Sequence, residues 1–247
     1  MTHFRSEGLS LAYEAVGEGP PVILVHGFAS NRVVNWKGTS WLDALANAGY
    51  RVVALDCRGH GESDKPRAVE AYRLTRHVRD VEALMDHLGI AKASFVGYSM
   101  GARIVLKLLL TQPARATKAV LGGLGLPERD PAFVETVARA FEAADLSSVT
   151  DPLALRFRSF AERQGGDLLA LAACFRGVHG PFDLSDAARI AVPVLIVAGE
   201  KDDHVTKPAV LAAAIPGARL VEVPGRDHMT VVGDPRFKDA ALEFLRR

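Results

Sequence analysis

Short, uninterrupted apolar runs along this chain alternate with longer segments whose apolar residues recur at helical spacing. An uninterrupted run is typical of a strand buried on both faces, and the second pattern of an amphipathic helix. Strands are expected at residues 22–25, 50–55, 94–96, 118–121, 192–198 and 220–223, and helices at 41–48, 74–88, 102–110, 207–215 and 237–245. Residues 2–16 alternate around a turn and are expected to form a hairpin at the sheet edge. We therefore predict an α/β fold, with a mostly parallel sheet and helices on both of its faces.

One long interval breaks this alternation. No strand pattern occurs from 130 to about 190, and Asp130 and Asp151 each precede a proline, an arrangement typical of a helix N-terminus. Because the interval interrupts an alternating chain, it is predicted to be a helical insertion. The expected division is a core formed by 1–126 and 191–247 and a helical cap formed by 127–190.

A serine stands at the junction between an expected strand and an expected helix. The pentapeptide 97–101, Gly-Tyr-Ser-Met-Gly, follows an apolar run and precedes a segment of good helix formers. A serine in such a strand-to-helix turn leaves no room for side chains two positions before and after it, which explains both glycines. The free amides at the helix start favour negative charge beside the hydroxyl. Ser99 is therefore a candidate nucleophile, although a helix start with small packing residues would explain the pentapeptide alone.

A second glycine turn, His26-Gly27-Phe28, follows the expected strand at 22–25. In an acyl-transfer site the amide after such a glycine can point at the oxyanion of the substrate. The backbone N–H groups of Phe28 and Met100 are therefore the expected oxyanion donors. A plain strand-to-loop turn is the alternative. His26 is expected to be structural, with its ring bonded to nearby backbone.

A hydroxyl nucleophile needs a base, and an imidazole base needs a carboxylate that fixes its tautomer. His228 follows the last expected strand, and Asp202 and Asp203 follow the strand before it. The carboxyl ends of parallel strands meet at one edge of the sheet, so these side chains are expected near Ser99. The chain thus offers a serine, a histidine and two adjacent candidates for the acid.

Composition narrows the classes of function. The chain has 247 residues, 49% of them hydrophobic and 24% charged, with a formal net charge of +1, so a globular fold without a nucleic-acid partner is expected. Cys57 and Cys174 have neither disulfide nor metal spacing and are expected to be buried, reduced thiols. The N-terminus lacks a hydrophobic signal region and no apolar run has the length of a membrane span, so a soluble, cytoplasmic protein without a membrane partner is expected. No spacing indicates a metal or a cofactor, and the oligomeric state is left open.

Together these motifs resemble the α/β-hydrolase fold superfamily over essentially the whole chain. The matching segments are His26-Gly27-Phe28, residues 56–63, residues 97–101, residues 199–202 and His228. Their order of serine, aspartate and histidine is that of the family. The resemblance implies that Ser99 is the nucleophile, that His228 is the general base and then the acid, and that Asp202 is the orienting carboxylate. It favours Asp202 over Asp203, because the family usually places the acid three residues after the glycine.

The resemblance predicts a serine hydrolase that cleaves a small ester, lactone or thioester through an acyl-enzyme, with a small-molecule acyl substrate as its partner. Carbon–carbon bond hydrolases and cofactor-free haloperoxidases share these motifs and are alternatives, as is a non-enzymatic ligand receptor. Epoxide hydrolases and haloalkane dehalogenases resemble the chain but use aspartate where Ser99 stands, which disfavours those activities.

The apolar stripes of the helical interval are expected to roof the Ser99 pocket, which favours a partly apolar substrate. Four arginines of this interval could meet a substrate carboxylate but are expected to be solvated: Arg156, Arg158, Arg163 and Arg176.

The loop 56–66 is expected to be a hydrogen-bonded structural loop without chemistry. The alternative is that it shapes one wall of the pocket, with Asp56 paired to Arg58. His60 and His204 flank the expected site, and both are expected to be structural or exposed.

Overall fold

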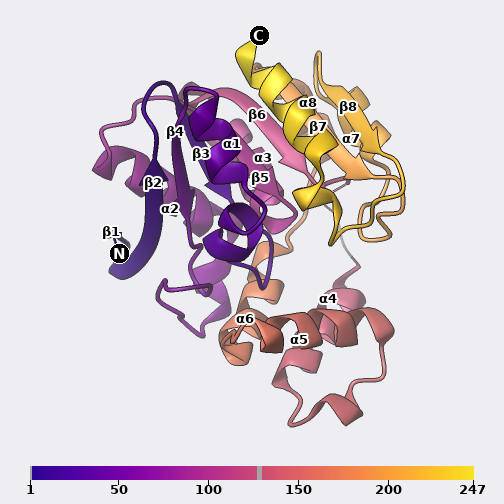
Figure 1. The fold of residues 1–247 in the computed structure, drawn as a ribbon. Coiled ribbons are helices and arrows are strands. Elements are labelled where there is room, and N and C mark those ends of the chain that lie inside the picture. The colour runs from indigo at the N-terminus through magenta and orange to yellow at the C-terminus, as the bar shows by residue number, and fades with distance from the viewer. Residues whose placement is uncertain (1, 127–129) are drawn as a thin grey trace.

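The computed structural model describes residues 2–126 and 130–247. Within these residues an eight-stranded sheet has the order β1-β2-β4-β3-β5-β6-β7-β8 (Figure 1). The strands are β1 (Thr2–Ser6), β2 (Leu9–Val16), β3 (Pro21–Val25), β4 (Arg51–Leu55), β5 (Ala93–Tyr98), β6 (Ala116–Gly122), β7 (Val194–Gly199) and β8 (Arg219–Val223). The β1–β2 and β2–β4 pairs are antiparallel, and the remaining pairs are parallel. The mostly parallel sheet and the hairpin at its edge are both confirmed.

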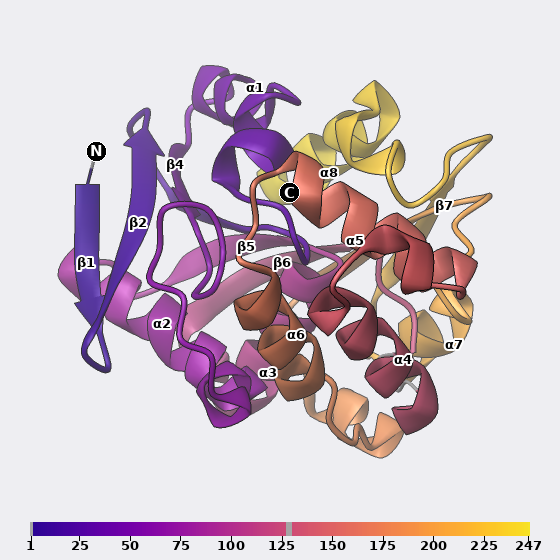
Figure 2. The ribbon, with the colours of Figure 1, turned by 90° about the horizontal axis from the view of Figure 1, so that it is seen from below.

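Helices cover both faces of the sheet because residues of the central strands alternate between two apolar layers. The helices are α1 (Trp41–Asn47), α2 (Leu74–His87), α3 (Met100–Thr111), α4 (Pro131–Glu142), α5 (Pro152–Arg163), α6 (Leu168–Val178), α7 (Pro208–Ala214) and α8 (Pro235–Arg246). Val22 and Leu24 of β3 pack in the layer that contains residues of α1 and α8. Ile23 and Val25 pack in the other layer, with residues of α2, α3 and α7. Figure 2 shows α1 and α8 on one side of the sheet and α2 and α3 on the other.

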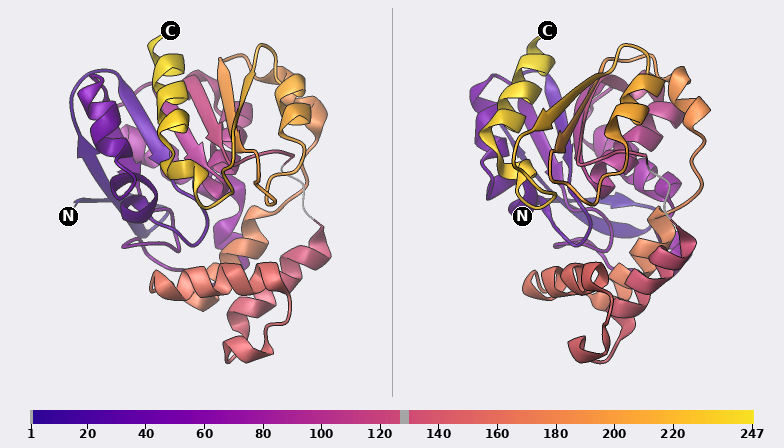
Figure 3. Two further views of the ribbon diagram at one scale, coloured as in Figure 1. Left: turned by 45° about the vertical axis from the view of Figure 1, so that its right-hand side comes forward. Right: turned by 90° about the vertical axis from the view of Figure 1, so that its right-hand side faces the viewer.

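The chain between β6 and β7 forms α4, α5 and α6, which we call the cap helices. Asp130 accepts a hydrogen bond from the amide of Ala132 at 2.9 Å and Asp151 from that of Ala154 at 2.8 Å, so both carboxylates cap helices as expected. Figure 3 shows the cap helices beyond one end of the sheet, away from the helices that cover its faces. The expected start of the cap, residue 127, lies outside the described residues.

Some features of the fold lie outside the patterns that predict strands and long helices. A π-helix at Val33–Lys37 and a 3₁₀-helix at Val69–Tyr72 span only one or two turns, too little for an apolar period to be recognised.

Cys57 and Cys174 are buried free thiols, as expected. No helix of the described residues combines the length and the apolar character that a bilayer crossing requires.

Candidate active site

Ser99 occupies a strained turn between β5 and α3. Its backbone has φ 52° and ψ −110°, a conformation that residues with a side chain rarely adopt. A Cβ atom at Gly101 would lie 1.9 Å from the carbonyl oxygen of Val25, and one at Gly97 would lie 2.5 Å from that of Gly101. Both glycines are therefore required sterically, because the start of α3 is pressed against β3 and β5. The turn lifts the Ser99 side chain beyond the strand ends.

His228 connects Ser99 to Asp202. Nε2 of His228 lies 3.0 Å from Oγ of Ser99, and Nδ1 lies 2.8 Å from Oδ2 of Asp202. An ionised carboxylate can only accept a hydrogen bond, so Nδ1 of His228 carries the hydrogen. The lone pair of Nε2 therefore faces the Ser99 hydroxyl. The three residues follow β5, β7 and β8, whose carboxyl ends share one edge of the sheet. The geometry allows His228 to remove the hydroxyl proton of Ser99.

Asp203 turns away from His228, although it is the next residue after Asp202. Its Oδ2 accepts a hydrogen bond from Arg156 of α5 at 2.9 Å, and this bond holds the pKa of the Asp203 carboxyl below its usual value. The Asp203 side chain is 61% exposed, whereas that of Asp202 is fully buried. Of the two adjacent candidates, Asp202 is therefore the one in contact with His228.

The two residues expected to supply the oxyanion donors, Phe28 and Met100, line one hollow together with Ser99. Met100 is the first residue of α3, so its N–H has no acceptor inside the helix. The amide of Gly27, immediately before Phe28, donates to Oδ1 of Asn35 at 2.8 Å and so fixes the turn after β3. An oxygen bound in this hollow would lie at the positive end of α3, beside the free N–H of Met100.

His26 is structural, as expected. Its Nε2 accepts a hydrogen bond from the amide of Cys57 at 3.0 Å, so Nδ1 carries the hydrogen and donates to the carbonyl of Gly27 at 2.8 Å. Burial lowers the pKa of His26 to about 4. The neutral ring therefore ties the turn after β3 to the loop after β4.

A cavity of about 490 Å³ opens onto Ser99 and His228. The cap helix α5 contributes apolar side chains to its wall, among them Leu155, Phe157 and Phe160. The insertion thus lies over the serine, as the apolar stripes predict. A ligand in this cavity would contact mostly apolar surface while its reacting group met Ser99.

The four arginines of the cap helices have different environments, and the expectation that all are solvated is wrong for Arg158. Its side chain is buried and donates to the carbonyl of Ala140 at 2.6 Å. Arg176 pairs with Glu135 and Glu142. Arg156 and Arg163 line the cavity, and no carboxylate of the described residues lines it with them.

A family model for the alpha/beta hydrolase fold matches residues 20–175. The chain belongs to this family. This α/β hydrolase is 29% identical over 263 residues to a Bacillus subtilis (strain 168) protein named "Putative 2-succinyl-6-hydroxy-2,4-cyclohexadiene-1-carboxylate synthase", and the match covers 94% of each chain. It is similar to the structure of a hydrolase from Pseudomonas aeruginosa PA01, with 29% identity, a TM-score of 0.85 and coverage of 100% and 98% of the two chains. It is also similar to the enol-lactonase from Burkholderia xenovorans LB400, with 25% identity, a TM-score of 0.86 and full coverage of both chains.

The loop after β4 holds the core of this α/β hydrolase together, and the alternative pairing of Asp56 with Arg58 is wrong. Asp56 binds Arg32, whose amide donates to Oδ1 at 2.7 Å. Arg58 donates two hydrogen bonds of 2.6 Å to the buried carboxylate of Asp80 in α2. Neither Asp56 nor Arg58 lines the cavity. The loop is therefore structural, as expected.

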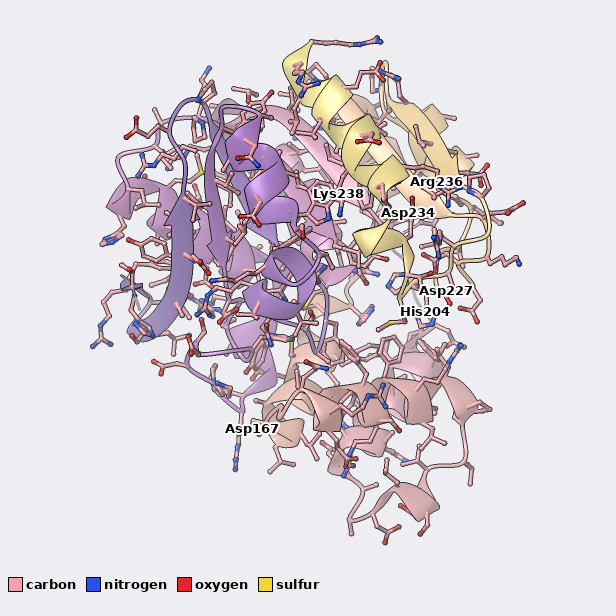
Figure 4. All side chains as sticks on the ribbon, viewed as in Figure 1. Asp167, His204, Asp227, Asp234, Arg236 and Lys238 are labelled. Atoms are coloured by element: carbon pink, nitrogen blue, oxygen red, sulfur yellow. The ribbon has the colours of Figure 1, made fainter. Side chains whose placement is uncertain are left out.

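Sequence reasoning missed the contribution of His204, which it assigned to the flank of the site. The His204 ring is buried and stacked on that of His228, with centroids 4.6 Å apart and an angle of 3° between the planes. Figure 4 shows His204 at the end of the sheet that faces the cap helices. The only signal in the sequence is its position two residues after Asp202. Within the described residues, no group of three or more His, Cys, Asp or Glu side chains is placed to hold a metal ion.

Proposed function

We propose that this protein is a serine hydrolase that cleaves a small, partly apolar ester, lactone or thioester through an acyl-enzyme. The observation that carries the proposal is the continuous hydrogen-bonded path from Asp202 through His228 to Ser99. A histidine held in this tautomer activates a hydroxyl as a nucleophile. No other group is needed for the first proton transfer.

In the acylation step, Oγ of Ser99 forms a bond to the carbonyl carbon while its proton passes to Nε2 of His228. The amides of Phe28 and Met100 bind the oxyanion, and Asp202 stabilises the imidazolium. The bond to the leaving group then breaks, and His228 returns the proton to the departing oxygen or sulfur. Water attacks the acyl-enzyme with His228 as base, and the acid is released with Ser99 restored.

The cavity supports a substrate with a compact apolar acyl part. Its volume of about 490 Å³ suits a small molecule, and Leu155, Phe157 and Phe160 of α5 supply apolar surface opposite Ser99. Similarity to an enol-lactonase supports including lactones in the class. The cap helices act in this proposal as a roof that excludes water from the acyl group.

Labelling and turnover test the proposal together. A fluorophosphonate probe is expected to modify the wild-type protein at Ser99, and short-chain p-nitrophenyl esters are expected to be hydrolysed. Ser99→Ala should abolish labelling and lower turnover by at least about 10³-fold. Labelling without turnover of esters, lactones or thioesters would instead favour a carbon–carbon bond hydrolase. The absence of both in the wild-type protein would favour a ligand receptor.

A further inference from the structure

His204 is held in place by the same turn that presents Asp202. The backbone amide of His204 donates to Oδ1 of Asp202 at 3.0 Å, and Oδ2 of that carboxylate accepts from His228. One carboxylate therefore fixes the position of both histidines. Because the two rings are stacked almost parallel, His204 limits the tilt of the His228 ring.

The cap helix α5 also contacts the His204 ring, directly through Phe157 and indirectly through Asp203. Nε2 of His204 lies 3.3 Å from Oδ1 of Asp203, and Asp203 is paired with Arg156 of α5. The ring of Phe157, the next residue of α5, meets the His204 ring edge-on with centroids 5.3 Å apart. The cap thus reaches the His228 ring through His204.

His204 is uncharged at neutral pH. Its burial, and then the proximity of His228, lower the pKa of His204 to about 4. A neutral aromatic ring stacked on an imidazolium attracts it through its π system, whereas a second cation there would repel it. The stacked pair therefore suits a reaction in which His228 alone becomes charged.

We propose that His204 is a positioning residue that holds the His228 ring in the plane needed for proton transfer and stabilises its cationic form, with the cap helix α5 securing it. This inference rests on the proposed acyl transfer. His228 first takes the proton of Ser99 and then gives it to the leaving group. An alkoxide must receive this proton as it leaves, whereas p-nitrophenolate leaves without one. Misalignment of His228 should therefore slow alkyl esters more than p-nitrophenyl esters.

The test compares His204→Ala with His204→Phe, which keeps a stacked ring but loses the contact with Asp203. His204→Ala is expected to lower kcat/KM, which reports acylation, by about 10- to 100-fold for an ethyl ester and by a factor at least about fivefold smaller for the matching p-nitrophenyl ester, whose leaving group needs no proton. His204→Phe should recover most of the loss. His87→Ala serves as the control and should change neither rate. It removes a histidine ring at the end of α2 that meets the Tyr13 ring edge-on and the Phe4 ring at a tilt.

Active sites are counted with the fluorophosphonate probe, so that kcat/KM refers to folded protein. An equal loss of kcat/KM on both esters, or no loss with either, would overturn the role of His204 while leaving the serine hydrolase intact. A loss in His204→Ala that His204→Phe does not recover would also overturn it. A wild-type protein that neither reacts with the probe nor hydrolyses esters would overturn the proposed function and this inference with it.

Discussion

Nδ1 of His228 is bonded to Asp202 at 2.8 Å, and the neighbouring carboxylate of Asp203 has no part in that bond. In Asp202→Asn the side-chain amide can donate to Nδ1, which places the hydrogen on Nε2 and blocks deprotonation of Ser99. We expect kcat to fall by about 10⁴-fold. Asp203→Asn keeps an oxygen acceptor for His204, so its kcat should fall by less than about fivefold. Steady-state kinetics of the two variants on one p-nitrophenyl ester checks this, and a larger loss at Asp203 would contradict the assignment.

The strained backbone of Ser99 predicts a difference between two inactive variants. Ser99→Ala keeps a Cβ atom at φ 52°, whereas Ser99→Gly removes it. Relief of strain exceeds the extra entropy of glycine in the unfolded chain, so Ser99→Gly should have a free energy of unfolding about 1 kcal/mol higher than Ser99→Ala. Urea denaturation of both variants measures this difference. Equal midpoints would contradict the prediction, because the relief of strain would then not exceed the entropy cost of glycine.

Buried neutral histidines predict a loss of stability in mild acid. Burial lowers the pKa of His26 to about 4, that of His60 to about 3 and that of His77 well below its usual value. Below about pH 6.5 the unfolded chain binds protons that the native chain does not, so stability is complete above that pH and falls as the pH drops towards 4. His26 alone accounts for about 3 kcal/mol of this loss.

Urea denaturation at several pH values between 7.5 and 4.5 measures how the free energy of unfolding depends on pH. His77 provides a variant for it, because its Nε2 is buried without a hydrogen-bond partner among the described residues. His77→Leu should reduce the slope of unfolding free energy against pH by about one proton. Glu7, whose pKa its arginine partners lower to about 2, contributes only below about pH 5 and contributes equally in the wild-type protein and in His77→Leu. A slope that does not change in His77→Leu would contradict the prediction.

The buried pair of Arg58 and Asp80 predicts a large loss of stability when one partner is removed. Asp80→Asn would leave the guanidinium, which is 2% exposed, with Glu7 at 3.1 Å as its one remaining carboxylate partner among the described residues. We expect the free energy of unfolding to fall by about 3 kcal/mol. The exposed pair of Arg156 and Asp203 is the matched control, and Arg156→Gln should cost less than about 1 kcal/mol. Denaturation of the two single variants makes the comparison, and similar losses would contradict it.

Much of the fold could be predicted because its signals are local. The run from Val22 to Val25 is apolar at every position because β3 is buried on both faces, and Gly97 reflects a contact with Gly101 and Ala102 in the same turn. The relative positions of Ser99, Asp202 and His228 follow from a rule of parallel sheets, that successive strands end at the same edge. Sequence order and strand position were therefore enough to bring these three residues together.

The partners of Asp56 and Arg58 could not be predicted in the same way. The two residues are close in sequence, but their side chains reach Arg32 and Asp80, which lie on other elements. The choice of partner for each charged side chain depends on how α2 and the turn after β3 pack on the sheet. The stacking of His204 on His228 depends likewise on the exact course of two loops. Such contacts are set by tertiary packing and leave no period or motif in the chain.

The cap helices leave the sheet after β6 and return to it at β7, and these two strands are immediate parallel neighbours. An interval that begins and ends on adjacent strands can be lengthened, shortened or exchanged without shifting the register of any strand pair. Selectivity can therefore diversify in this interval, by natural variation or by grafting a relative's segment, while the chemistry on the sheet is inherited unchanged.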